Sequence, residues 1–480
     1  MPNIILLFMI YVEFYNNFMY ISCSFRNNYL YLPSQMSPKI KQTSMFRLIF
    51  LCVLSCSSVL FAQESSQPKA SVPAVVHVKT GEEFDISGQM TIRHIGRHQR
   101  YNGRDTLSYD LDIHSPKSVS MNPEGTKYYV NSLEGYKTIA YDANTHKKLS
   151  VVKHSFTSRD SALWANPSGF YEFRHEYSHP NTFSGKPVES TFTHNGAYLW
   201  VPYYRRSYDI NAQDPSAIAV IDTRTDKVIR LFETGALPKM VASSGGGKWV
   251  AVTHWGENTV GIIDVSSENP EDWHYDNNYI IDYKFEPDYS LTVPVNRDVK
   301  SGYCLRGTVF TPDNKYVLVG CMGGSGGIGV IDLEAKRYRG RISGMKSNLR
   351  HLLIHDGWLY LSINNQGLVQ RIRLETLLDA IQKFVNRKVT LTGWETCKVK
   401  QGARTISISP DGRYIFAACN SSSCLAVVDT ETFKMIGSVP VDSYPVGLDI
   451  SDDGRTVFVT SQGRNDRGGN AVNIFQIDYK

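Results

Sequence analysis

The stretch ARTISISPDGRYIFAAC, residues 403–419, decides the fold. Apolar and polar residues alternate on both sides of Pro-Asp-Gly, which predicts two antiparallel strands joined by a tight turn. The same pattern recurs along the chain, clearly at 238–254, 305–321 and 444–461 and more weakly at 116–132, 187–203 and 349–364. The sequence therefore contains seven copies of one β-hairpin.

A third apolar run follows most hairpins and usually reaches an aspartate, at Asp142, Asp222, Asp264, Asp332 and Asp429. Aspartate at the end of a strand opens a turn by accepting backbone N–H groups. A fourth run follows, as in KVIRLFETG (227–235) and KMIGSVPV (434–441). Seven repeats of four antiparallel strands predict an all-β protein, a seven-bladed β-propeller over residues 115–480.

The last repeat ends after its third strand, NAVNIFQIDYK. Since an incomplete blade would leave an open edge, we expect the ring to be closed by an N-terminal strand from residues 73–96. The segment LETLLDAIQKFVN (374–386) has apolar residues at helical spacing and is interpreted as a packing helix on the opposite side from the predicted site.

Two long stretches, 219–238 and 426–461, resemble the YVTN-type repeats of bacterial YncE-like and surface-layer propellers. The resemblance extends over residues 115–480 and implies the same seven-bladed framework. Lactonase propellers belong to the same fold superfamily, so the resemblance is compatible with several activities and selects none.

The whole chain is predicted to consist of three segments. They are a signal region at 1–62, a segment at 63–114 that contains the ring-closing strand, and the propeller at 115–480. Within 36–62 a basic stretch precedes an apolar run that ends at Ala62, which is typical of an export signal. This predicts a protein of the periplasm or cell surface, and a start codon placed too far upstream would explain residues 1–35. Lipidation of Cys56 is the alternative to release.

Composition excludes several classes of function. The formal net charge is +5 over 480 residues, so no polybasic or acidic character indicates nucleic acid as a partner. The chain has no C-x-x-C-H sequence for haem attachment, and no apolar run after the signal is long enough to span a membrane. No cofactor is predicted.

One column of the repeat alignment, eight residues before the turn, is basic in five of seven repeats. Its members are Lys117, Val188, Lys239, Arg306, Arg350, Arg404 and Val446. The innermost strands of a propeller line its channel, so these cations should gather at one end of it and attract an anion. The alternative is that each is neutralised by a neighbouring carboxylate. The predicted rim of the site consists of Tyr203, Arg205, Arg206, His254 and Trp255.

The expected partner is an anionic small molecule, an acidic glycan or an envelope protein bound at this basic channel mouth. The second hypothesis is an enzyme of the lactonase or lyase sort, in which cations stabilise an oxyanion and His254 or His351 acts as acid or base. The third is a protein-interaction scaffold that uses the same face.

The segment HEYSH (175–179) matches the H-E-x-x-H motif of zinc proteases. That motif needs a helix, and Pro180 directly after the second histidine argues against one. We interpret the match as accidental and predict no metal site, with His175 and His179 as weak candidates. Cys419 and Cys424 flank a short loop between two strands and are predicted to form a disulfide.

Overall fold

The computed structural model describes residues 9–15, 18–25, 28–33, 76–100, 108–171, 182–206, 215–285, 302–463 and 468–480. The chain divides into two compact units, Met1–Ala74 and Val75–Lys480. In the first unit β1 (Met9–Tyr15), β2 (Phe18–Phe25) and β3 (Asn28–Pro33) form an antiparallel sheet that the sequence does not predict. The export signal expected within 36–62 lies outside the described residues.

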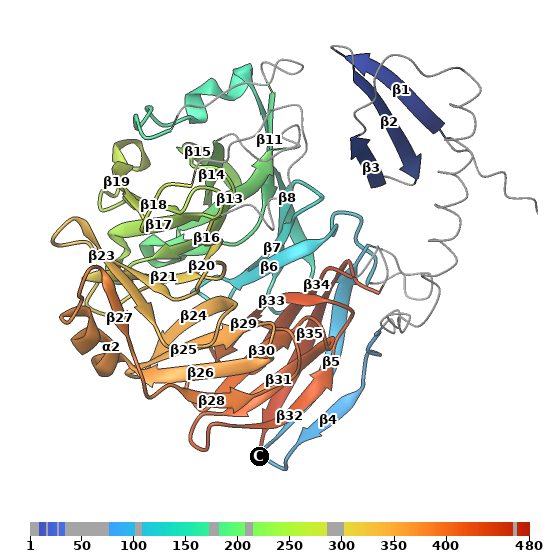
Figure 1. Cartoon of the computed structure of the whole chain (residues 1–480). Coiled ribbons are helices and arrows are strands. Elements are labelled where there is room, and N and C mark those ends of the chain that lie inside the picture. The colour runs from blue at the N-terminus through green and yellow to red at the C-terminus, as the bar shows by residue number, and fades with distance from the viewer. Residues whose placement is uncertain are drawn as a thin grey trace, which may run out of the picture. The chain divides into compact units, whose positions relative to one another are not determined.

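The second unit is a seven-bladed β-propeller, as predicted. Its blades radiate from a central channel, and one strand of each blade lies innermost (Figure 1). The innermost strands are β6 (Pro116–Met121), β12 (Thr191–Thr193), β16 (Pro238–Ser243), β20 (Leu305–Phe310), β24 (Leu349–His355), β29 (Ala403–Ile408) and β33 (Pro445–Ile450). The second strands are β7 (Lys127–Ser132), β13 (Tyr198–Arg206), β17 (Trp249–His254), β21 (Tyr316–Cys321), β25 (Trp358–Ile363), β30 (Tyr414–Cys419) and β34 (Thr456–Ser461).

The two outer strands of each blade continue the antiparallel order. The third strands are β8 (Lys137–Asp142), β14 (Ser216–Asp222), β18 (Thr259–Asp264), β22 (Ile328–Asp332), β26 (Leu368–Arg373), β31 (Cys424–Asp429) and β35 (Ala471–Tyr479). The fourth strands are β9 (Lys148–Lys153), β15 (Lys227–Thr234), β19 (His274–Ile280), β23 (Arg337–Ser343), β28 (Glu395–Lys398), β32 (Lys434–Pro440) and, from the N-terminal side, β5 (Met90–Gln99).

The turn between the first two strands contains a left-handed residue at the same place in every blade. The predicted turn residues all have positive φ, at Gly125, Gly196, Gly247, Asn314, Gly357, Gly412 and Gly454. Glycine adopts this left-handed region without steric cost, and asparagine tolerates it better than most residues. This requirement explains why only glycine and asparagine occupy that column.

The aspartates that end the third strands act as predicted. Asp142 Oδ1 accepts the backbone N–H groups of Asn144 and Thr145. Asp429 Oδ1 accepts that of Thr432 at 2.8 Å, and Asp222, Asp264 and Asp332 make equivalent contacts. These hydrogen bonds fix the turn that leads to the fourth strand.

An N-terminal strand closes the ring, as expected. β5 pairs antiparallel with β35 along nearly its whole length, from Ala471 opposite Gln99 to Tyr479 opposite Met90 (Figure 1). β4 (Glu83–Ile86) then adds a further strand outside β5. The last blade therefore combines both ends of the propeller unit.

The insertions add small elements at the blade edges. β10 (Ser155–Thr157) and β11 (Thr182–Pro187) extend the second blade, and β27 (Lys388–Thr390) pairs parallel with β23. The predicted helix is present as α2 (Leu374–Ile381), which buries Leu374, Leu377 and Ile381 against the apolar core. Among the described residues no helix has the length and apolar character needed to cross a membrane.

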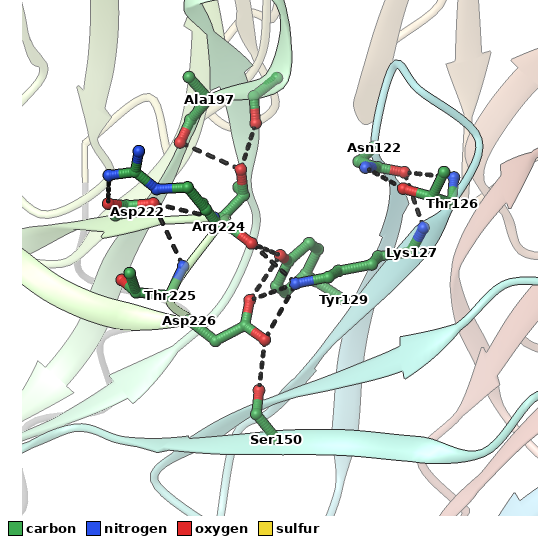
Figure 2. A network of polar contacts seen from close by, with 12 residues as sticks. Asn122, Thr126, Lys127, Tyr129, Ser150, Ala197, Asp222, Arg224, Thr225 and Asp226 are labelled. Carbon is green, nitrogen blue, oxygen red and sulfur yellow. Dashed lines mark hydrogen bonds and ion pairs between the residues drawn. The ribbon is translucent and has the colours of Figure 1, made fainter.

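Neighbouring blades are joined by apolar and polar contacts. Buried side chains of the first two blades, such as Tyr129 and Leu199, belong to one apolar cluster. At its edge Asp226 accepts hydrogen bonds from the Tyr129 hydroxyl and Ser150, each 2.8 Å long, and forms an ion pair with Lys127 (Figure 2). The Asp226 carboxylate of the second blade thus binds to two strands of the first blade, β7 and β9.

Candidate ligand site at the basic end of the channel

The five predicted cations occupy equivalent places in five innermost strands. Lys117, Lys239, Arg306, Arg350 and Arg404 are each the second residue of their strand. Val446 occupies this place in β33, and Val188 lies just before β12. We call the five cations the basic ring.

The backbone around each ring residue is irregular in the same way. The pairing of the first two strands shifts register at the ring residue in all five strands, and at Val446 as well. Such β-bulges leave a residue out of the ladder and redirect its side chain. Two positions earlier lies a residue with positive φ, namely Ser115, Leu237, Cys304, Asn348, Gly402 and Tyr444.

Leucine and tyrosine seldom adopt positive φ, because their Cβ atoms clash with the backbone. Their presence at Leu237 and Tyr444 means that the surrounding structure enforces this conformation. Strain of this kind concentrates at functional sites. The bulge and the left-handed residue together place one cation in each of five blades at the same end of the channel.

Four of the ring cations are almost completely buried: Lys117, Lys239, Arg306 and Arg404 are 3, 7, 6 and 9% exposed. Lys117 forms an ion pair with Glu189, which follows Val188 in the second blade. Among the described residues, Lys239, Arg306 and Arg404 form no ion pair with a carboxylate. Buried charges are normally paired, so these three are exceptions that require an explanation.

Within the described part of the chain, aromatic rings and not carboxylates contact two of these buried cations. Lys239 Nζ lies 3.6 Å from the centre of the Tyr204 ring and 5.4 Å from that of Trp255. Arg306 Cζ lies 4.5 Å from the centre of the Trp255 ring, and Arg306 Nε has no hydrogen-bond partner among the described residues. The faces of aromatic rings attract cations but do not neutralise them.

The ring cations are close enough to perturb one another. Burial, followed by the charges of Arg306, Lys117 and Arg404, holds the pKa of Lys239 well below its usual value. Burial also lowers the pKa of Lys117 to about 8, although the adjacent Glu189 carboxylate opposes the shift. Burial, followed by the charges of Arg350 and Arg404, likewise holds the pKa of Arg306 well below its usual value. The ring is thus a concentration of positive charge held against electrostatic repulsion.

A cavity of about 430 Å³ lies along the channel next to the ring, and equivalent residues of all seven innermost strands line it. Its wall contains many hydroxyl groups, including those of Ser118, Ser190, Thr308 and Thr405. Glu189 lines it too, which connects the cavity to the basic ring through Lys117. The volume is that of a site for a small molecule.

Two further titratable groups line the cavity. Burial lowers the pKa of His351 to about 4, with Glu189 and Lys117 acting on it in opposite directions. Burial raises the pKa of Asp449 to about 6, although its carboxylate accepts the backbone N–H groups of Met121 and Ile450. Both groups are therefore largely uncharged in slightly acidic solution.

The structure places some predicted rim residues beside the ring. Trp255 contacts Lys239 and Arg306, and Arg205 lies 5.3 Å from the centre of the Tyr204 ring. Arg206 ends β13, and its side chain lies outside the described part of the chain.

Two predicted rim residues lie away from the cavity instead. Tyr203 is fully buried between blades, and its hydroxyl forms a hydrogen bond of 2.9 Å with His154 Nδ1. His254 is also fully buried, with its Nδ1 2.9 Å from Thr259 Oγ1 and its ring against Tyr171. Their side chains therefore lie in the packing of the sheets and not at the cavity, and a role for them in binding stays a prediction. His351 is the candidate acid or base that lines the cavity.

The remaining predicted residues have different outcomes. Cys419 and Cys424 lie directly opposite each other in the β30–β31 hairpin, but both are free thiols and the predicted disulfide is not formed. Register brings the two residues together without joining them. His175 and His179 lie outside the described residues. Within the described part of the chain no group of His, Cys, Asp and Glu residues is placed to hold a metal ion.

Sequence reasoning missed Glu189 and the role of Tyr204. Glu189 immediately follows the valine that interrupts the basic column, so a search of the adjacent column for acidic residues would have found it. Tyr204 cannot be assigned in this way, because its contact with Lys239 joins the second blade to the third.

Comparison with known proteins supports the architecture. No family model matches the sequence, and no curated protein matches it. Similar solved structures include hydrazine synthase of Kuenenia stuttgartiensis, with a TM-score of 0.53 and 14% identity over 78% of this chain and 99% of that chain. Another is the β-propeller domain of Cps50 (Swd1) of Myceliophteria thermophila, with a TM-score of 0.48 and 10% identity over 76% of this chain and 96% of that one.

At 14% identity, the likeness to the Kuenenia protein shows the fold and carries no activity to this chain. The propeller that the YVTN resemblance implies is confirmed, whereas membership of that family stays a prediction. The chain is a seven-bladed β-propeller with a basic ring at one end of its channel.

Proposed function

We propose that this chain is an exported binding protein of the YVTN-repeat type, which takes an anionic ligand at the basic ring. The observation that carries the proposal is the burial of Lys239, Arg306 and Arg404 without a carboxylate partner among the described residues. An anion bound among them would supply the missing negative charge. Arginine suits this purpose because its planar group donates two parallel hydrogen bonds to a carboxylate or phosphate.

The backbone geometry supports the interpretation that the basic ring is a preorganised binding site and not a chance cluster of cations. Bulges and left-handed residues recur at the ring in blades whose sequences otherwise differ. A site organised before binding loses less entropy when the ligand arrives. The adjacent cavity provides room for the rest of a small molecule.

The test is a thermal-shift and calorimetric screen of the purified chain against carboxylates, phosphates and acidic sugars. A ligand that binds only the folded state raises the melting temperature. Arg404→Gln should abolish the rise, whereas Lys315→Gln, which removes an exposed partner of Glu334, should retain it. The proposal is wrong if no anion stabilises the wild-type protein, or if both variants respond as the wild type does.

A second candidate function is a lactonase-like or lyase-like reaction at the same place. It is favoured by the position of His351, which lines the cavity and is influenced by Glu189 and Lys117. A largely neutral imidazole can accept a proton while the cations stabilise an oxyanion. His351→Gln should then abolish turnover of a lactone panel and leave anion binding intact. Turnover that survives this substitution would exclude His351 as the base.

Export is proposed on the basis of residues 36–62, where basic residues precede an apolar run. Residence in the periplasm or at the cell surface follows from it, with lipidation at Cys56 as the alternative. Sequencing the N-terminus of protein recovered from cell fractions distinguishes cleavage after Ala62 from a lipid-modified Cys56.

A further inference from the structure

The number of buried ring cations that lack a carboxylate partner within the described part of the chain indicates how many negative charges a ligand needs. Lys117 is already paired with Glu189, which leaves Lys239, Arg306 and Arg404 as buried cations without a carboxylate among the described residues. They come from the third, fourth and sixth blades. The positive charge at this end of the channel therefore comes from several blades.

Glu189 indicates what the ring accepts. It stands in the blade where valine replaces the cation, and its carboxylate contacts Lys117 at the edge of the cavity. Its negative charge also reaches Lys239 and Arg306 and opposes the fall of their pKa values. Glu189 thus behaves as a resident anion that neutralises one of the ring cations.

One further negative charge would not balance the ring. A monocarboxylate would neutralise one of these three buried cations and leave the other two buried together. Uncompensated buried charges are costly, whereas several oxyanion groups held in one small molecule can pair with several cations at once. The spread of the cations over different blades favours a ligand that presents oxygens on more than one side.

We propose that the ligand is a small polyanion with three or more negative charges, of the tricarboxylate or pyrophosphate class, and that Glu189 limits the number of charges the ring accepts. This inference rests on the proposed function. Glu189 is then a specificity-determining residue, because its carboxylate occupies Lys117 and repels additional negative charge.

The experiment is a charge series measured by isothermal titration calorimetry at constant ionic strength and neutral pH. Acetate, succinate and citrate form one arm, and phosphate and pyrophosphate form the other. Citrate and pyrophosphate should bind at least about tenfold more tightly than acetate and phosphate, since each added ion pair in a dry site contributes on the order of a kcal/mol or more. The two arms also separate carboxylate from phosphoryl recognition.

Glu189→Gln tests the second half of the proposal. It releases Lys117, so the affinity for citrate or pyrophosphate should rise about tenfold, whereas loss of a merely structural contact would leave it unchanged or lower it. Glu334→Gln is the matched control, because it removes an exposed carboxylate that pairs with Lys315. Its affinity should equal that of the wild type.

The outcomes separate this inference from the proposed function. Equal affinity for acetate and citrate, or an unchanged affinity in Glu189→Gln, would overturn the polyanion proposal while anion binding itself stands. Absence of binding by every anion in the series would overturn both.

Discussion

At the scale of single residues, four of the ring cations are buried close together at the expense of stability. In the part of the chain that the structure describes, Arg306 Nε has no hydrogen-bond partner. Burial, followed by the charges of Arg350 and Arg404, lowers the pKa of the guanidinium. Replacing a buried charged group by an apolar one of similar size is often neutral or stabilising. Residues of this kind mark a compromise between stability and function.

Arg306→Met should therefore raise the free energy of unfolding of the ligand-free protein by about 1 kcal/mol, because the repulsion within the ring falls. The same substitution should abolish stabilisation by anions. Chemical denaturation with and without citrate measures both effects. The control is Arg371→Met, which breaks the contact with Glu395 and should lower stability without changing the response to citrate. Loss of stability in Arg306→Met would show that the guanidinium is structural.

The lowered pKa values of Lys117 and Lys239 lead to a prediction of how anion binding depends on pH. The pKa of Lys117 is lowered to about 8 and that of Lys239 lies well below its usual value, first of all because both are buried. An anion favours their protonated forms, so affinity should fall as pH rises through about 8 at Lys117, and binding should take up protons. Calorimetry with citrate in buffers of different ionisation enthalpy measures this uptake. An affinity that stays constant from neutral to alkaline pH would contradict it.

At the scale of elements, the innermost strands must approach closely to bring the cations together. A Cβ atom on Gly307 would lie 2.6 Å from the backbone nitrogen of Leu352 and 2.9 Å from His351 Cα, both in the neighbouring strand. On Gly447 it would meet Lys117 O at 2.6 Å. These two glycines allow adjacent blades to touch beside the channel.

Gly307→Ala should destabilise the protein by about 2 kcal/mol or more and weaken anion binding, because β20 and β24 carry Arg306 and Arg350 and would be forced apart. Thermal denaturation and citrate titration measure the two effects. Gly357→Ala is the matched control, since no atom lies within 4 Å of its Cβ position and its φ of +72° is the main cost. It should lose stability alone. Normal citrate affinity in Gly307→Ala would show that the close approach does not position the cations.

The same elements show what sequence can predict. Hairpins, aspartate turns and left-handed turn glycines depend on residues near one another in the chain, so the repeats reveal them. The basic column was found in the same way. The side-chain directions of Tyr203 and His254 were not, because Tyr203 contacts His154 of the preceding blade and His254 packs against Thr259 and Tyr171, which the repeat pattern does not show. The position of Glu189 beside the basic column is visible in the sequence, but its contact with Lys117 is not, since the two residues belong to different blades.

At the scale of the whole molecule, the circular arrangement of the blades depends on packing that repeats from blade to blade and on the closing strand pair β5–β35. Several histidines that are buried or half-buried lie in this packing. His94 and His98 belong to β5, His154 follows the first blade, and His254 ends β17. Each has a polar partner, such as Asn473 for His94 and the Tyr128 hydroxyl for His98.

These histidines predict acid unfolding at mildly acidic pH. Burial is the first cause that lowers their pKa values from 6.5, to about 4 for His94 and His98 and to about 3 for His154 and His254. The unfolded chain therefore binds more protons below pH 6.5, and stability that is complete above this pH is lost as pH falls towards 4. A shift from 6.5 to 4 corresponds to about 3 kcal/mol per histidine.

Denaturant midpoints measured from neutral to acidic pH test this prediction and assign it to particular residues. His98→Phe should flatten the fall in stability, because phenylalanine can keep the stacking on Tyr141, where the ring centres lie 4.1 Å apart, without a group that must remain unprotonated. The price is the hydrogen bond to the Tyr128 hydroxyl, so stability at neutral pH should be lower by about 1 kcal/mol. His274→Phe, at an exposed position, should leave the slope unchanged. A slope that is the same in His98→Phe and in the wild type would mean that protonation of His98 does not contribute to acid unfolding of the propeller.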